Sequence, residues 1–244
     1  MRRIGLALAA SMVGGTAASA EINVAVAANF TMPAQALAAA FEAQSGNRVL
    51  LSFGATGALY AQITQGAPFV ALLAADDARP AQAVAEGHGV EGTSFTYAIG
   101  ALALYSSTID LTDGEAVLSG GSFTHLAIAD PVTAPYGAAA VKVIAGLGLT
   151  QAVTPKFVSG QNIAQALQFV ESGNAELGFV ALSQVMEKPA AQVWRVPAEL
   201  HQAIRQDAVL LKPGEHDHVA KAFLDFLKSD AARAIIASHG YDAP

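Results

Sequence analysis

The sequence predicts an α/β protein with two lobes, and three observations support that prediction. Short apolar segments alternate with Ala-rich helical segments along most of the 244 residues, a pattern typical of parallel sheets covered by helices. Several apolar segments run through a small polar residue directly into a helix. Two further apolar segments, 95–105 and 205–211, are long enough to carry the chain between lobes.

The predicted elements of the first lobe alternate between strand and helix. We expect strands at 22–28, 48–53 and 69–74 and helices at 32–44, 57–65 and 79–86. Thr31 and Pro33 are favourable at the start of the first helix, and Gly46 is favourable at its end. Thr56 is the expected N-cap of the second helix.

The middle of the chain repeats this order. We expect strands at 126–129, 156–158 and 177–181, helices at 138–147 and 163–171, and two later helices at 219–228 and 231–238. If the two long apolar segments are crossings, residues near both termini share one lobe. We therefore expect 21–98 and 206–244 in lobe 1 and 99–205 in lobe 2. A ligand would then lie in the cleft between them, at the carboxyl ends of the strands.

Residues 1–20 have the composition of an export signal. A basic pair, Arg2 and Arg3, precedes an apolar run over 4–13 and a small-residue cleavage site at 18–20, so we expect the mature chain to begin at Glu21. The apolar run is too short to remain in a bilayer as a spanning helix. The chain has no Cys to carry a lipid, so we expect no direct membrane anchor.

Composition excludes several classes of function. The formal net charge of −7 becomes −9 once Arg2 and Arg3 are removed, which is unsuited to nucleic acid. The absence of Cys removes disulfides, thiol nucleophiles and thiolate metal sites. The sequence also lacks the G-x-S-x-G, P-loop and H-E-x-x-H motifs, so we expect no enzyme. A hydrolase using Thr56 or Ser52 would need a neighbouring base, and the sequence supplies none nearby.

Four turns suit an anion because each opens a helix with unpaired backbone N–H groups. None of the 13 Lys and Arg residues lies inside these turns, so an anion would be held by neutral donors. An ordinary helix start remains the alternative at each turn, and at 161–163 a simple Asn162 cap is the better interpretation of the residues taken alone. The turns contribute as candidates Ala28, Asn29, Thr56, Gly57, Tyr136 and Ile163.

Taken together, the motifs resemble one known family over nearly the whole mature chain. The matching stretches are 24–31, 52–57, 66–69, 75–77, 130–131, 134–137, 160–163 and 174–180. In these stretches the chain resembles the periplasmic molybdate-binding proteins of ABC importers. The resemblance implies a type II periplasmic binding fold, in which each lobe is a mainly parallel sheet flanked by helices and a tetrahedral oxyanion lies in the interlobe cleft.

The resemblance also implies a set of ligand-binding residues. Asn29 and Thr56 would donate from lobe 1 by side chain and backbone, and Tyr136 and Ile163 from lobe 2 by backbone N–H. Ala28 and Gly57 are supporting positions. Part of the family uses a Tyr hydroxyl where this chain has Ala181, and other members have Ser in place of Asn29. These departures indicate the branch that uses Asn in the first turn.

The implied function is that of a periplasmic solute-binding protein. It would capture molybdate, and also tungstate, and deliver the anion to the membrane permease of an ABC importer. We expect a monomer with no cofactor, in which the only metal is that of the bound molybdate oxyanion. The alternative is a receptor for another tetrahedral oxyanion such as sulfate.

Overall fold

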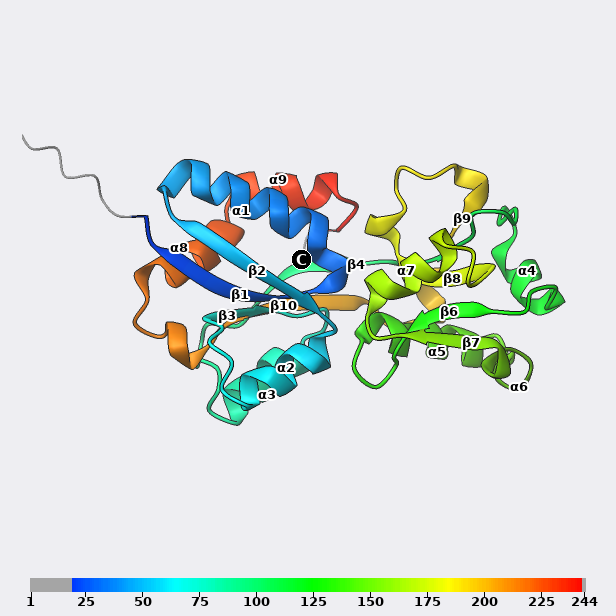
Figure 1. The fold of residues 1–244 in the computed structure, drawn as a ribbon, viewed down its shortest axis with the longest axis horizontal. Coiled ribbons are helices and arrows are strands. Elements are labelled where there is room, and N and C mark those ends of the chain that lie inside the picture. Colours follow the sequence, from blue (N-terminus) through cyan, green and yellow to red (C-terminus); the bar gives the residue numbers. More distant parts are fainter. Residues whose placement is uncertain (1–18, 243–244) are drawn as a thin grey trace, which may run out of the picture.

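The computed structural model describes residues 19–242, which form two lobes lying side by side (Figure 1). Most of the expected export signal, 1–18, lies outside these residues. In the described part of the chain the strands form two five-stranded sheets, ordered β2-β1-β3-β10-β4 and β7-β6-β8-β5-β9. The two-sheet α/β fold expected from the sequence is therefore confirmed.

The first sheet and its helices come from both ends of the chain. Its strands are β1 (Glu21–Ala27), β2 (Arg48–Gly54), β3 (Ala71–Leu73), β4 (Phe95–Gly100) and β10 (Ile204–Leu210). Its helices are η1 (Ala28–Phe30), α1 (Thr31–Ser45), α2 (Thr56–Thr64), α3 (Ala78–Ala85), η6 (Lys212–Gly214), α8 (His218–Leu227) and α9 (Asp230–Ser238). The helices α1, α8 and α9 cover one face of the sheet, and α2 and α3 cover the other (Figure 1).

The second sheet is built from the middle of the chain. Its strands are β5 (Leu102–Tyr105), β6 (Leu126–Ala129), β7 (Phe157–Gly160), β8 (Leu177–Ala181) and β9 (Val193–Arg195). Its helices are α4 (Gly114–Gly120), α5 (Pro135–Gly146), α6 (Thr150–Val153), η2 (Thr154–Lys156), α7 (Ile163–Glu171), η3 (Leu182–Gln184), η4 (Ala190–Gln192) and η5 (Ala198–Leu200). The strand β9 and the helices α4 and α6 were not predicted, because they are short and have little periodicity.

Burial on both faces explains why the central strands read as continuous apolar segments. In β1, Val24 and Val26 pack with α1 and α8, whereas Ala25 points to the opposite face and packs with α2. Each sheet is mixed: β1 pairs in parallel with β2 and β3, and β10 pairs antiparallel with β3 and β4. In the second sheet, β6 pairs in parallel with β7 and β8, and β5 pairs antiparallel with β8 and β9.

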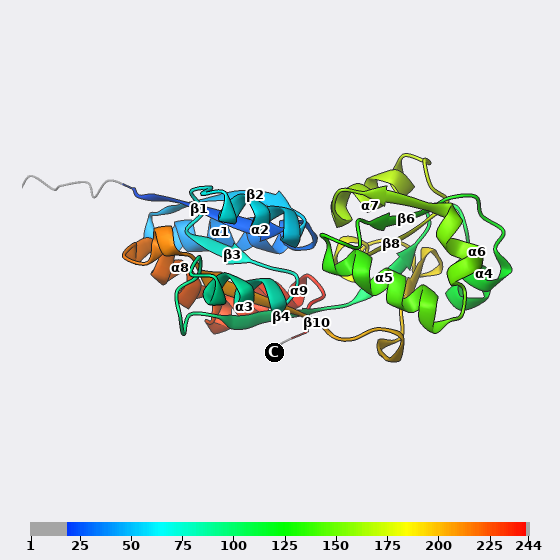
Figure 2. The same cartoon turned by 90° about the horizontal axis from the view of Figure 1, so that it is seen from below.

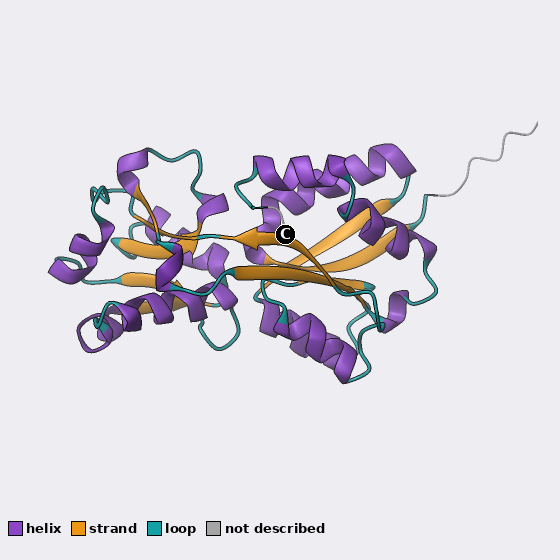
Figure 3. Cartoon of the chain, turned by 180° about the vertical axis from the view of Figure 1, so that it is seen from behind, coloured by secondary structure: helices purple, strands orange, loops and turns teal. Residues whose placement is uncertain are grey.

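The chain changes sheet at two places that lie close together (Figures 2 and 3). The predicted segment 95–105 is divided at Ala101 into β4 and β5, which belong to different sheets. The segment predicted as the other crossing, 205–211, instead lies in the first sheet as β10, and the crossing precedes it at 196–203. Gly100 pairs with Ile204, so the crossings leave the first sheet side by side. The lobe boundaries 98/99 and 205/206 remain a prediction.

Candidate functional site

The helices α2, α5 and α7 and the 3-10 helix η1 all begin around one small cavity between the two sheets. The cavity measures about 10 Å³, on a scale where one water molecule needs roughly 10–15 Å³. In this arrangement it has room for about one water molecule, so a tetrahedral oxyanion would need the surrounding turns to move apart. Its lining residues come from all four turns singled out in the sequence: Ala27, Ala28, Asn29, Gly54, Ala55, Thr56, Ala75, Ala134, Pro135, Asn162 and Ile163.

Thr56 lies at the start of α2 and is fully buried. The expectation that it caps this helix is wrong, since Ala55 occupies the N-cap position and the Thr56 hydroxyl makes no capping bond. The hydroxyl oxygen instead accepts a hydrogen bond from the Ala75 N–H at 2.9 Å. Because a hydroxyl also carries one hydrogen, Thr56 keeps a donor for a ligand in the cavity.

The second lobe presents backbone donors at two helix starts. Pro135 is the first residue of α5 and has no N–H, so Tyr136 supplies the first available donor of that helix. Asn162 caps α7, as expected, and its side chain accepts from the N–H groups of Ala164 and Gln165. This cap leaves the N–H of Ile163 without an intrahelical or capping acceptor.

Asn29 lines the cavity, but its side-chain donors are used elsewhere. The amide nitrogen Nδ2 donates to Oε1 of Gln206 at 2.9 Å and to the hydroxyl of Tyr241 at 3.0 Å. Both amide hydrogens are therefore committed within the protein. In this arrangement Asn29 can offer an anion its backbone N–H, in the first turn of η1, but not the side-chain donor expected from the sequence.

Of the remaining predicted positions, one lines the cavity and the others are next to its lining residues in the chain. Ala28 lines it, whereas Tyr136 and Gly57 are each one residue beyond a lining residue. The N–H of Gly57 donates to the carbonyl oxygen of Thr133 at 2.8 Å, so it is not available to a ligand. Ala181 is fully buried at the end of β8 and does not line the cavity.

The electrostatics of the cavity come from helix ends, because the lining residues described above carry no charged side chain. The helices α2, α5 and α7 all begin there, and the N-terminus of a helix carries a partial positive charge. Asp76 is the acidic residue next to the lining residue Ala75. Burial raises the pKa of its carboxyl, although a hydrogen bond from the Arg79 N–H opposes that rise. The cavity therefore favours an anion through neutral donors.

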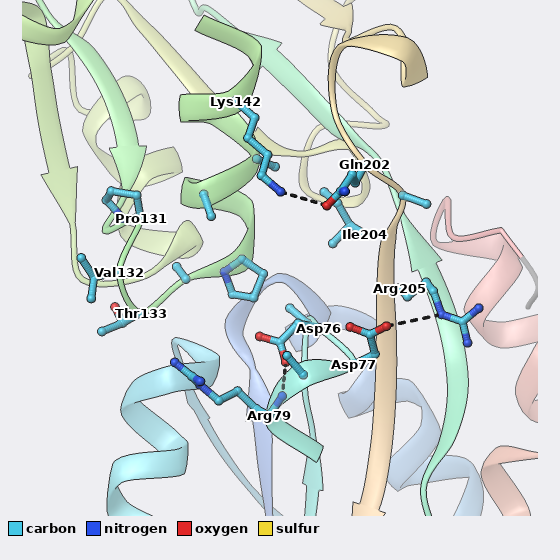
Figure 4. A pocket seen from close by; sticks show the side chains of 17 residues that line it. Asp76, Asp77, Arg79, Pro131, Val132, Thr133, Lys142, Gln202, Ile204 and Arg205 are labelled. Carbon is cyan, nitrogen blue, oxygen red and sulfur yellow. Dashed lines mark hydrogen bonds and ion pairs between the residues drawn. The ribbon is translucent and has the colours of Figure 1, made fainter. Parts of the chain in front are cut away.

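A larger hollow of about 320 Å³ lies against this cavity and shares Ala75, Ala134 and Pro135 with it. Figure 4 shows that its charged side chains come from both lobes. Lys142 Nζ donates to Oε1 of Gln202 at 2.9 Å, and Arg205 lies 3.9 Å from the Asp77 carboxylate. The hollow is thus polar and mixed in charge, in contrast to the small cavity.

Within residues 19–242, no three His, Cys, Asp or Glu side chains come together as a metal site. Asp217, from the His-Asp-His sequence at 216–218, caps α8 by accepting from the N–H groups of Val219 and Ala220. In the same part of the chain, no helix is long and apolar enough to cross a membrane.

A buried polar cluster that was not predicted from the sequence lies beside the cavity. Its centre is Gln206 in β10, and its other members are Asn29, Tyr97, Tyr136, Ser183 and Tyr241. The available signal was a single Gln in β10, between the charged residues Arg205 and Asp207. Its meaning depends on partners far away in the chain.

Two mixed sheets joined by paired crossings, with donors from both lobes around one small cavity, define a bilobal solute-binding protein. A family model described as "Bacterial extracellular solute-binding protein" matches residues 22–242. The chain is 49% identical to the molybdate-binding protein ModA of Azotobacter vinelandii, over 99% of this chain and 97% of the relative. It is also 49% identical to ModA of Rhodobacter capsulatus, over 92% and 89% respectively.

A solved structure supports the same relationship. The periplasmic molybdate-binding protein of Azotobacter vinelandii superposes with a TM-score of 0.87 at 37% identity, covering 91% of this chain and 99% of that one. The chain therefore belongs to the bacterial extracellular solute-binding proteins, in the branch of the molybdate-binding proteins ModA.

Proposed function

We propose that this protein is a periplasmic receptor that captures molybdate and delivers it to the permease of an ABC importer. The observation that carries the proposal is the meeting of α2, α5 and α7 at one cavity whose lining residues carry no charge. The similarity to proteins named for molybdate binding supports the same ligand. The N–H groups of Tyr136 and Ile163, the hydroxyl and N–H of Thr56 and the N–H of Asn29 are the proposed donors.

The energetics of such a site suit a desolvated dianion. Each hydrogen bond to a charged group contributes roughly 1.5–3 kcal/mol, so a few well-aimed donors can replace the hydration of the anion. A site built only of donors penalises protonated phosphate, because the phosphate proton needs an acceptor. Sulfate is smaller than molybdate and would leave some of these bonds too long. Tungstate matches molybdate in charge and shape and should bind as well.

Closure of the two lobes is the proposed mechanism of capture. The donors belong to both lobes, so an anion contacts all of them only when the lobes are together and its binding favours the closed arrangement. We propose no chemical step. Thr56 contributes a hydroxyl to the cavity, but the residues that line the cavity include no basic side chain that could activate it as a nucleophile. We also propose that the chain is exported, loses residues 1–20 and acts as a monomer.

Calorimetric titration of the protein with molybdate, tungstate, sulfate and phosphate tests this function. We expect tight 1:1 binding of molybdate and tungstate, with sulfate and phosphate weaker by at least about 100-fold, which corresponds to about 2.7 kcal/mol. Equal affinity for sulfate would favour the alternative of a receptor for another tetrahedral oxyanion. No binding of any of the four anions would refute an oxyanion receptor.

A further inference from the structure

Gln206 is a fully buried polar residue in β10, and both ends of its amide are hydrogen-bonded. Its oxygen Oε1 accepts from Nδ2 of Asn29 at 2.9 Å and from the hydroxyl of Tyr97 at 3.1 Å. Its nitrogen Nε2 donates to the hydroxyl of Tyr136 at 3.1 Å. Since oxygen accepts and nitrogen donates, the partners fix the orientation of the amide.

These bonds connect the two lobes at the proposed ligand donors. Asn29 belongs to η1, which directly follows β1 of the first sheet, whereas Tyr136 belongs to α5 and packs with the second sheet. Each residue also supplies one of the backbone N–H groups proposed to hold the anion. A single side chain therefore contacts the donor-bearing turn of each lobe.

Tyr241 forms a second connection around the same turn. Its hydroxyl donates to the carbonyl oxygen of Asn29 at 2.7 Å and accepts from Nδ2 of that residue at 3.0 Å. It also lies 2.9 Å from Oγ of Ser183, which follows β8 of the second sheet. Burial raises the pKa of Tyr241 to about 12, so its hydroxyl stays protonated at neutral pH.

Close packing at the crossing supports the same arrangement. A Cβ added to Gly100, the last residue of β4, would clash with the Tyr136 hydroxyl and with Nε2 of Gln206. The pair of side chains thus occupies the space that any larger residue would need. In the described part of the chain, every buried side-chain N or O atom has at least one hydrogen-bond partner, so no polar side-chain atom of the cluster is left without one.

We propose that Gln206 is a positioning residue that sets the relative placement of the Asn29 and Tyr136 donors across the two lobes. This inference rests on the proposed function, because those donors are assigned from it. Gln206 itself does not line the cavity. Its contribution is preorganisation: the anion meets two N–H groups whose separation is already fixed, and so loses less free energy in ordering them.

Two single-hydroxyl variants provide a matched test. Tyr136→Phe removes the partner of Gln206 in the second lobe and keeps the Tyr136 backbone N–H. Tyr97→Phe removes a partner in the first lobe, from a strand in the same sheet as β10. Both delete one hydroxyl from a buried ring bonded to the same amide, and Tyr97→Phe also removes a bond to the carbonyl oxygen of Ala74 at 2.9 Å. A purely structural role would therefore make Tyr97→Phe at least as damaging as Tyr136→Phe.

Affinity and interlobe distance should separate these variants. We expect Tyr136→Phe and Gln206→Met each to weaken molybdate binding roughly 3- to 10-fold, the effect of one net hydrogen bond, and Tyr97→Phe to change it less than about 2-fold. The double variant Gln206→Met with Tyr136→Phe should be no weaker than the worse single variant, because both remove the same connection. Additive losses, or equal losses in Tyr97→Phe and Tyr136→Phe, would overturn the proposal.

A measurement without ligand keeps the two proposals separate. The chain has no native Cys, so labels at Glu42→Cys and Gln168→Cys, both exposed, report the distance between lobes. We expect a broader distance distribution in Tyr136→Phe than in wild type, and no broadening in Tyr97→Phe. If wild type binds no molybdate but this difference appears, the proposed function fails, and what stands is the connection of the two lobes through Gln206. If molybdate binds but the distributions are identical, only the role of Gln206 fails.

Discussion

The N–H of Gly57 donates to the carbonyl oxygen of Thr133 at 2.8 Å, which joins the start of α2 in one lobe to the loop before α5 in the other. The Thr133 loop is held by Asp130, whose carboxylate accepts from the Val132 N–H and the Thr133 hydroxyl. A backbone bond between lobes requires them to be in contact. The structure therefore represents a closed arrangement.

Gly57→Ala should weaken ligand binding by holding the lobes slightly apart. The added Cβ would lie 3.1 Å from both Cα and the carbonyl oxygen of Thr133, so one lobe must shift. We expect a loss of roughly 1–3 kcal/mol in molybdate affinity, the usual cost of overpacking. Gly120→Ala is the matched control, because it also adds a methyl group within a helix but meets nothing within 4 Å. Calorimetry showing equal affinity in the two variants would contradict this role for the contact.

Thr56→Ala should weaken molybdate binding by roughly 1.5–3 kcal/mol, because it removes a hydroxyl donor to a charged ligand. It should also lower the melting temperature, since the buried Ala75 N–H loses its acceptor. Thr56→Ser keeps the hydroxyl and should restore most of both losses. A Ser variant as weak as the Ala variant would show that the methyl group, and not the hydroxyl, is required.

The local parts of this molecule could be predicted from sequence. The apolar run of β1 reflects burial on both faces, Gly46 ends α1 with a positive φ of 72°, and Asn162 caps α7. Gly46 and Asn162 act through contacts within a few residues along the chain, and the apolar run of β1 indicates a buried strand whichever helices cover it. The same reasoning identified the four turns that surround the small cavity.

The parts that depend on distant contacts could not be predicted. Nothing local at Ala101 shows that β4 and β5 pair in different sheets, since that depends on the competing partners β10 and β8. The Asn29 side chain was expected to face the ligand, but it bonds to Gln206 and Tyr241, 177 and 212 residues away. An Asn in an anion-binding turn has the same local sequence in either role.

Molybdate should raise the melting temperature of the protein more than sulfate does at the same concentration. A ligand that binds only the folded state stabilises it by mass action, by about 2.7 kcal/mol when its concentration is 100 times the dissociation constant. A thermal-shift titration of both anions at constant ionic strength measures the difference. Indistinguishable curves would contradict selection of the anion by the distances between it and the donors.

Asp76→Asn should stabilise the protein at neutral pH. Burial raises the pKa of the Asp76 carboxyl in the folded state, so its ionised form destabilises the fold at pH values above that raised pKa. The penalty disappears below the unfolded pKa of about 4, where the carboxyl is protonated in both states. Melting temperatures should therefore favour the variant at pH 7 and converge in acid. Asp77→Asn, at an exposed neighbour, is the control and should show a smaller difference.

A crystal structure of the protein grown with molybdate would show whether neutral donors from both lobes hold the anion in the small cavity. Anomalous scattering locates the molybdenum atom unambiguously. We predict that it lies between Thr56 and Ile163, with its oxygens about 2.7–3.2 Å from the N–H groups of Tyr136 and Ile163 and from the Thr56 hydroxyl. Molybdenum in the larger hollow instead, bound by Lys142 or Arg205, would contradict the account.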